Sequence, residues 1–450
     1  MTDLLDQSPL LALAERLVAA AKTAGADAAD AVAVRSVSLS VEVRDGKVEE
    51  TERAEGDDVG LRVLVGRKQA VVSTNDLKGN GADVLAERAV AMARVAPEDK
   101  FVGLADPALL VHTFPDLDLV DPALPDVATL ERHARAAESA ALAVKGVTKS
   151  GGASAAAGLG GLVLVTSHGF RGAYVGSRHS LSAMAIAGEG TGMERDYDFT
   201  SVLHGQDLEA PEKIGRSAGE RAVRRLNPRK VETRRAPVVF DPRVAGSLVG
   251  HLAAAINGAS IARKTSFLKD RMGERLFPAG IRIIDDPLRR RGLRSHPFDG
   301  EGVGGKLLAV IDDGVLKSWF LDSATARELS LVTTGHAARG VSSSPSPSPT
   351  NLHLEPGKQS PQELIGAIKD GLYVTDLIGT GANLVTGDYS RGASGLWIEN
   401  GELTYPVSEI TIAGHLNEIF GSLAPANDLE FRYGTNAPTV RVEGLTIAGT

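Results

Sequence analysis

The stretch 371–414 constrains the fold of this chain more than any other part of the sequence. It contains short strand-like runs that end at glycines or at Asn400-Gly401. Asn-Gly is the strongest short signal for a β-hairpin because both of its residues tolerate positive φ. The stretch therefore predicts tight antiparallel strands, since so short a turn leaves no room for a crossover helix. The runs that we expect to be strands are 372–378, 383–386, 394–398 and 402–406, the last of which leads into 408–412, with a glycine-rich bend at 387–392.

The same turn chemistry recurs and indicates the fold class. Asp45-Gly46 and Asp313-Gly314 also join strand-like runs, and apolar stripes typical of helices lie between such hairpins. The polar stretch 227–237, which has a proline near each end, separates two halves. We therefore predict an α+β fold with two domains, residues 1–230 and 231–450, each with a mostly antiparallel sheet and packed helices.

In the first half we expect a helix near the N-terminus and then a meander of four strands. Further helices and strands follow before the boundary. The expected strands are 31–43, 47–54, 59–65, 69–73, 151–157, 161–166 and 172–186, and the later helices are 81–95, 130–144 and 209–226. In the second half the Ser/Pro segment 342–349 is expected to be ordered and extended, because proline favours a stiff conformation.

Composition excludes several classes of partner and site. The chain has 450 residues and a formal net charge of −8, which argues against a nucleic-acid surface. No apolar run is long enough to suggest a membrane span, and the acidic N-terminus does not resemble a secretory signal. Cysteine is absent, which excludes disulfides, thiolate catalysis and cysteine metal ligands.

Two short motifs could suggest phosphate binding, and we interpret both as loops. Arg289-Arg290-Arg291 is a basic cluster that we expect to be solvated. The glycine-rich run 300–305 is not placed between a strand and a helix, so a flexible loop is expected there rather than a phosphate cradle.

Several longer segments resemble the TldD/PmbA family, and most of all its PmbA branch, also called TldE. The resemblance covers about 30–450 and is densest after residue 237. Its segments include FDPRVAGSLVGHLAAAINGASIARKTSFLKDRMGE, TGHAARG, SPSPTNLHLEPG, GLYVTDLIG and GANLVTGDYSRGASG. It implies a cytoplasmic protein that forms a heterodimer with a TldD-type zinc peptidase and acts on peptide substrates.

The helix that carries zinc in the TldD branch is degenerate here. There it holds a His-Glu-x-x-x-His motif, completed by a distant cysteine. Aligned on Gly250, the motif has Gly250 and Ala255 in place of the two ligands and His251 in place of the acid. Aligned on His251, it has Leu252 in place of the acid and Ile256 in place of the second ligand. The resemblance thus implies no catalytic residue and no metal or other cofactor in this chain, with zinc held by the partner.

Polar residues in the resembling segments could instead form a groove for an extended peptide or for the partner subunit. The alternative is a structural role, because such groups are usually paired inside their own domain. The candidates are Arg263, Lys264, Thr265, Ser266, His336, Arg339, Asp388, Tyr389, Ser390, Arg391 and Gly392.

Three interpretations of function remain open at this stage. The first is a PmbA/TldE-type subunit that is inactive alone and works with a TldD-type partner, with a homodimer possible in isolation. The second is an autonomous metallopeptidase with an unrecognised metal site. The third is a peptide-binding scaffold unconnected with proteolysis.

Overall fold

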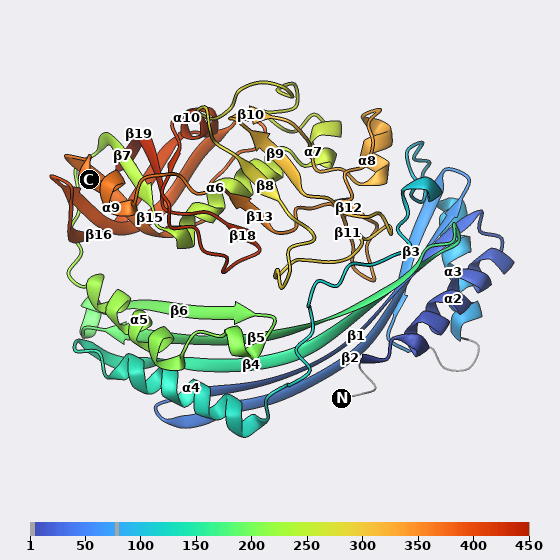
Figure 1. Cartoon of the computed structure of the whole chain (residues 1–450), viewed down its shortest axis with the longest axis horizontal. Coiled ribbons are helices and arrows are strands. Elements are labelled where there is room, and N and C mark those ends of the chain that lie inside the picture. The colour runs from blue at the N-terminus through green and yellow to red at the C-terminus, as the bar shows by residue number, and fades with distance from the viewer. Residues whose placement is uncertain (1–4, 77–80, 450) are drawn as a thin grey trace.

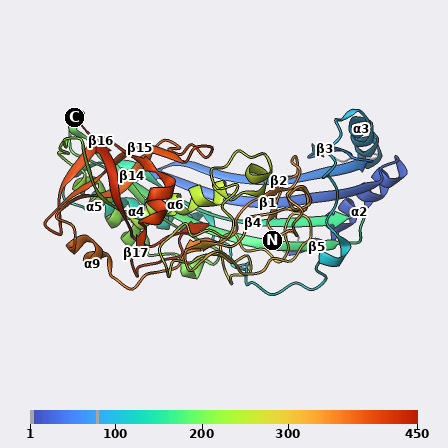
Figure 2. The same ribbon diagram turned by 90° about the horizontal axis from the view of Figure 1, so that it is seen from above.

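The computed structural model describes residues 5–76 and 81–449, which form two halves (Figure 1). A long curved sheet with two pairs of helices makes up the first half. The β-rich second half lies over part of that sheet. Seen from above, α2 and α3 extend beyond the second half, at the end of the molecule remote from the C-terminus (Figure 2).

The first half is one six-stranded antiparallel sheet in the order β3-β2-β1-β4-β5-β6. Its strands are β1 (Ala28–Arg44), β2 (Lys47–Val65), β3 (Lys68–Thr74), β4 (Val147–Thr166), β5 (Arg171–Ala187) and β6 (Glu194–Val202). Its helices are α2 (Ser8–Thr23), α3 (Gly81–Val95), α4 (Val127–Leu142) and α5 (Pro211–Arg224).

Two predicted strand breaks in the first half are wrong, one in the four-strand meander and one in the later strands. The runs 47–54 and 59–65 form the single strand β2, and 151–157 and 161–166 form the single strand β4. Glycines that suggested breaks lie inside continuous ladders, because β4 pairs with β1 on one side and β5 on the other. These two ladders use the backbone groups on both edges of β4, which a single sequence window cannot indicate. Strand β6 was not predicted.

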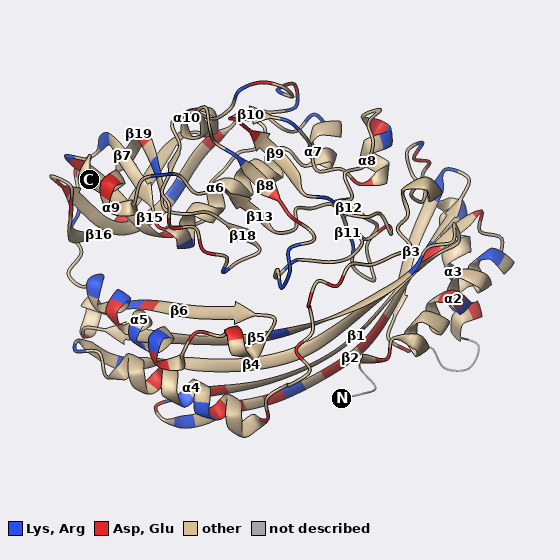
Figure 3. Cartoon of the chain, viewed as in Figure 1, with Lys and Arg blue, Asp and Glu red and all other residues tan. Residues whose placement is uncertain are grey.

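All four helices cover one face of this sheet. Ala31 and Ala33 pack against α2 and α3, and Val41 packs against α4 and α5 further along β1. These residues share a face because side chains alternate along a strand. Val32 points to the opposite face, where it joins a cluster with Phe298 of the second half. Both acidic and basic residues lie along α4 and α5 (Figure 3).

The second half contains a closed ring of five strands. Strands follow the order β16-β15-β14-β7-β19, and a further pairing between β16 and β19 closes the ring. A separate sheet has the order β10-β9-β8-β13-β18. The longer strands are β7 (Arg234–Phe240), β9 (Leu308–Asp312), β14 (Asp370–Ile378), β15 (Asp388–Glu399), β16 (Glu402–His415) and β19 (Val440–Ala448). The short strands are β8 (Ile283–Asp285), β10 (Val315–Leu316), β11 (Ala337–Ala338), β12 (Ser346–Pro347), β13 (Leu352–Leu354), β17 (Ala424–Pro425) and β18 (Thr435–Asn436).

Five short or medium helices are described in this half. They are α6 (Pro242–Ala255), α7 (Gly258–Ala262), α8 (Ser323–Glu328), α9 (Pro361–Gly366) and α10 (Leu416–Gly421). One large core joins four of them to the sheets, and the remaining one, α9, packs through Ile365 in a smaller cluster with Val239 and Ile398. None of the helices within 5–76 and 81–449 is both long and apolar enough to cross a membrane. The Ser/Pro segment takes part in the fold, because β12 pairs with β11.

The predicted hairpins are confirmed, but one predicted strand is wrong. Asn400 and Gly401 have φ of 50° and 84° and join β15 to β16. The residues 383–386 form a turn instead of a strand, because the Asn383 side chain accepts hydrogen bonds from the N–H groups of Val385 and Thr386. The predicted bend at 387–392 is also shifted, since β15 already begins at Asp388.

Two glycines in helices offer a matched test of packing. A Cβ added to Gly215 of α5 would lie 1.8 Å from the carbonyl oxygen of Ala137 in α4, whereas one at Gly250 of α6 would meet nothing within 4 Å. We expect Gly215→Ala to lower the free energy of unfolding by about 1–2 kcal/mol, since overpacking forces backbone shifts. Gly250→Ala should raise it by about 0.5–1 kcal/mol through helix propensity. Urea denaturation of both variants would check this, and equal shifts would contradict the helix contact.

Candidate functional site

Helix α6, which corresponds to the zinc-bearing helix of the TldD branch, is held firmly at its start. The Asp241 carboxylate accepts the N–H of Arg243 at 2.9 Å and the hydroxyl of Tyr373 at 2.8 Å. An aspartate cap followed by proline fixes where a helix begins. The two residues at the zinc-ligand positions of the motif differ in environment. Gly250 is half-buried, whereas Ala255 is fully buried in the core.

His251 lies against Tyr389 and Arg391 of β15. The His251 and Tyr389 rings are edge-to-face, with centroids 5.8 Å apart. Burial first, and then the charge of Arg391, lower the pKa of His251 to about 4, and burial raises the pKa of Tyr389 to about 12. The His251 Nε2, the Tyr389 hydroxyl and the Arg391 Nε are buried and make no hydrogen bond of good geometry with the described residues. This cluster is therefore uncharged at His251 and cationic at Arg391 near neutral pH.

The residues of this helix do not fit a zinc site. Gly250 and Ala255 have no donor atoms, and His251 is a single imidazole. Across 5–76 and 81–449 no group of three or more His, Cys, Asp or Glu residues is placed to hold a metal ion. Zinc in proteins takes at least three protein ligands. The residues of α6 therefore offer too few ligands for zinc.

The candidate site residues after α7 shape the loop in which they lie, through backbone conformation and hydrogen bonds. Lys264 has φ of 59°, the Thr265 hydroxyl donates to the Ser260 carbonyl at 3.3 Å, and the Ser266 hydroxyl donates to the Ala255 carbonyl at 2.6 Å. Arg263 is the C-cap residue of α7. These hydrogen bonds stay within the second half, and binding of a peptide or a partner by the same residues stays a prediction.

This loop lies beside the start of β15. The N–H of Phe267 donates to the Leu384 carbonyl at 2.8 Å, in the turn that precedes β15. The Asp388 carboxylate accepts the Thr386 hydroxyl at 2.6 Å, and the N–H of Ser390 donates to the Gly381 carbonyl at 2.8 Å. The structure thus brings the 263–266 candidates and the 388–392 candidates into one region around α6, with the latter on a strand and not in a turn.

His336 and Arg339 do not belong to that region. The His336 Nε2 lies 3.1 Å from the Asp285 carboxylate, and both side chains are fully buried. Arg339 Nη1 donates at 2.5 Å to Asp30 of β1, which also pairs with Arg62 of β2. Burial alone would raise the pKa of Asp30, but the charges of the two arginines and their hydrogen bonds lower it below its usual value. Arg339 therefore joins the two halves, whereas the hydrogen bonds of His336 lie within the second half. The proposed groove did not include either role.

The two loop interpretations also need correction. Asp299 holds the glycine-rich run, since its carboxylate accepts the N–H groups of Glu301, Val303 and Ala337 at 2.9–3.0 Å. The basic cluster is not simply solvated, because Arg291 donates to Asp118 and Asp207 of the first half. Both segments are therefore fixed parts of the junction between the halves.

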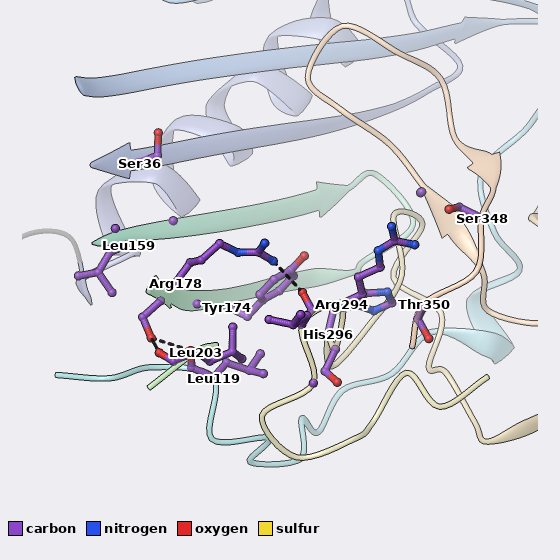
Figure 4. Close-up of a pocket in the computed structure, with 18 of the residues that line it drawn as sticks. Ser36, Leu119, Leu159, Tyr174, Arg178, Leu203, Arg294, His296, Ser348 and Thr350 are labelled. Atoms are coloured by element: carbon purple, nitrogen blue, oxygen red, sulfur yellow. Dashed lines mark hydrogen bonds between the residues drawn. The ribbon is translucent and has the colours of Figure 1, made fainter. Parts of the chain in front are cut away.

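A cavity of about 710 Å³ lies between the two halves (Figure 4). Sequence reasoning missed it, although the row of small residues in β4 is visible in the sequence. β1, β4 and β5 form its floor, and loops of the second half form its roof. The lining of this cavity includes Ser36, Gly160, Gly176, Arg178, Arg294 and His296.

Comparisons with known proteins agree with this architecture. Family models described as PmbA/TldA metallopeptidase match domain 1 at residues 29–93, the central domain at 120–226 and the C-terminal domain at 233–449. The chain is 39% identical to metalloprotease PmbA of Escherichia coli O157:H7 over 94% of this chain and 92% of that protein. The chain belongs to the PmbA branch of the PmbA/TldD family.

Other members of the family share the sequence and the whole fold. A PmbA homologue of Haemophilus influenzae is 38% identical over 95% of this chain and 94% of that protein. A solved structure from Bacteroides thetaiotaomicron, described as a putative modulator of DNA gyrase, has a TM-score of 0.90 at 28% identity and covers 99% of both chains. TldE from Thermococcus kodakarensis, at 20% identity and a TM-score of 0.85 over 97% of this chain and 99% of that chain, supports the fold.

The family segments do not coincide with separate sheets. The first two matched segments contribute strands to the same six-stranded sheet, while the third corresponds to the second half. The predicted boundary at 227–237 overlaps the gap between the second and third segments, and the two-domain division stays a prediction.

Proposed function

We propose that this chain is the PmbA/TldE-type subunit of a two-subunit cytoplasmic metalloprotease that processes or degrades peptides and unfolded segments. Its partner is a TldD-type subunit that carries the zinc, and this chain supplies no metal ligand and is inactive alone. When isolated, it forms a dimer with a second copy of itself.

The observation that carries this proposal is the environment of α6. The helix keeps its capped start and its packing, yet Gly250 and Ala255 offer no ligand atoms. His251 faces Tyr389 and the positive charge of Arg391. A cation next to a histidine opposes metal binding and favours the neutral imidazole. The family fold combined with a helix unsuited to zinc supports a subunit that depends on a partner for chemistry.

Reconstitution with a TldD-type subunit from the same organism tests the proposal. We expect the chain alone to hold no stoichiometric zinc and to leave an unfolded protein such as reduced casein intact. The mixture should degrade that protein, and its activity should fail when the partner's His-Glu-x-x-x-His motif is altered, because the metal-bound water supplies the nucleophile.

Two results would overturn the proposal. Equal activity of the TldD-type subunit with and without this chain would remove the subunit role. About one tightly held zinc per chain, together with chelator-sensitive hydrolysis by the chain alone, would favour the autonomous metallopeptidase.

A further inference from the structure

The floor of the inter-half cavity is a row of very small residues. Ser36 of β1 pairs with Gly160 of β4, and Gly160 pairs with Gly176 of β5. A Cβ added to Gly160 would meet nothing within 4 Å, and one at Gly176 would meet only the Leu119 carbonyl oxygen at 3.8 Å. The floor is therefore open to close approach by another backbone, which is a recurring use of glycine in strands.

The walls of the cavity are fixed before any ligand enters. The Ser177 hydroxyl donates to the Leu203 carbonyl at 2.6 Å and accepts the N–H of Asp121 at 2.7 Å, which holds two wall segments against β5. The N–H of Arg294 donates to the Asn351 side chain at 3.0 Å, which holds the loop opposite. A preformed cavity costs a ligand less ordering free energy.

The cavity is cationic although the chain as a whole is acidic. Among the described residues, its lining contains Arg178 and Arg294 but no Asp or Glu. Burial lowers the pKa of His296, so the positive charge comes from the two arginines. Arg178 donates to a neutral acceptor, the Leu293 carbonyl, at 3.3 Å (Figure 4). Neither arginine forms an ion pair with the described residues, and the buried Nδ1 of His296 has no hydrogen-bond partner there. The nearby Asp285 is occupied by His336 and Thr350.

We propose that this cavity binds short, extended peptide segments that carry a carboxylate, on an acidic side chain or at a C-terminus. Taking the ligand to be a peptide rests on the proposed function, whereas the carboxylate follows from the unpaired arginines. Guanidinium groups form strong charge-assisted hydrogen bonds with carboxylates. The volume lies within the range of about 300–1,000 Å³ typical of ligand pockets, so a few residues would fill it.

The ligand does not bind as an added strand. β4 is paired on both edges, so its backbone N–H and C=O groups are already used. Recognition must therefore come from side chains, namely the exposed hydroxyls of Ser36 and Ser38 and the two arginines, over a glycine floor. This distinguishes the cavity from peptide sites that extend the edge of a sheet.

Calorimetric titration of the full chain alone tests the proposal. The probes are short peptides of Gly and Ser with amidated C-termini and either two Asp or two Asn residues, and the Gly/Ser/Asn peptide with a free C-terminus. We expect the peptide with Asp, the free-carboxylate peptide or both to bind about tenfold more tightly than the neutral peptide, as one or two charge-assisted hydrogen bonds would give. The pattern identifies which carboxylate is recognised.

Amino-acid substitutions distinguish peptide binding in the cavity from binding elsewhere on the surface. Arg178→Gln with Arg294→Gln should abolish the preference for a carboxylate, and Gly160→Leu should weaken all binding by filling the floor. The matched controls are Arg53→Gln on the exposed part of β2 and Gly192→Leu, where a Cβ also meets nothing within 4 Å. Absence of binding, equal binding of the neutral amidated peptide, or unchanged binding by the cavity variants would overturn the proposal.

The test is independent of the subunit role because no second subunit is present. If reconstitution succeeds and the isolated chain binds no carboxylate peptide, the ligand assignment alone is wrong. If the carboxylate peptides bind as expected and reconstitution fails, the cavity assignment stands and the subunit role is wrong.

Discussion

Replacing Asp30 by Asn is expected to lower the free energy of unfolding by about 3–5 kcal/mol, because it breaks a buried ion pair. The side chains of Asp30, Arg62 and Arg339 are only 2%, 4% and 1% exposed. Arg339 donates to Asp30 through Nη1, while its Nε and Nη2 have no hydrogen-bond partner among the described residues. Without the carboxylate, the guanidinium groups of Arg62 and Arg339 both stay buried and lose their shared partner. Urea denaturation followed by circular dichroism measures the change.

A double-mutant cycle gives this prediction a sharp control. Arg339→Met alone should destabilise the protein, and adding it to Asp30→Asn should recover part of the loss, since one of the two stranded charges is then gone. Glu55→Gln breaks a pair with Arg53 whose side chains are about two-thirds exposed, and it should leave stability nearly unchanged. Strictly additive losses at Asp30 and Arg339 would contradict the pairing of the two halves through this site.

Lowering the pH from neutral to about 4.5 should reduce the free energy of unfolding of the unmodified chain. The reduction should be about 2–3 kcal/mol larger than in a His251→Phe variant. The pKa of His251 in the folded chain is about 4, because of burial and then Arg391. Its ordinary value in an unfolded chain is about 6.5. Below that value only the unfolded chain binds the proton, so stability is lost as the pH falls from about 6.5 to 4. Denaturation at neutral pH and at about pH 4.5 gives the difference.

The Arg391 contribution can be measured separately. In an Arg391→Gln variant, the pKa of His251 should rise, but it should stay below the ordinary value because burial is the larger cause. Titration of the imidazole by NMR reports this directly. His168→Phe, in an exposed turn, controls for the loss of a histidine as such. An unchanged pKa of His251 would show that Arg391 does not act on it.

Local turn chemistry was predictable from the sequence, whereas strand length was not. Asp45-Gly46, Asp313-Gly314 and Asn400-Gly401 all adopt the positive φ values that their types favour. In contrast, β4 continues through its glycines because strands from distant parts of the chain pair with both of its edges. No local window contains that information.

The candidate site was predictable only in part, because some of its contacts join distant parts of the chain. The region around α6 was predicted from the family resemblance, since 263–266 and 388–392 lie far apart in the sequence. Arg339 was misplaced because its partner, Asp30, lies at the other end of the chain. The inter-half cavity was missed because its floor and roof come from different halves, and glycines contribute to it by lacking side chains.

The position of β1 at the centre of its sheet also affects how the chain matures as it is synthesised. β1 can pair with β2 as soon as the Asp45-Gly46 turn has formed, but its other edge waits for β4, since Ala33 pairs with Val163. Until then a long strand rich in valine exposes unpaired backbone groups, which is the condition under which nascent chains associate wrongly. Such distant pairing also slows folding. The rate at which the segment before β4 leaves the ribosome, more than the stability of the finished sheet, should therefore decide how much of this protein reaches its native form.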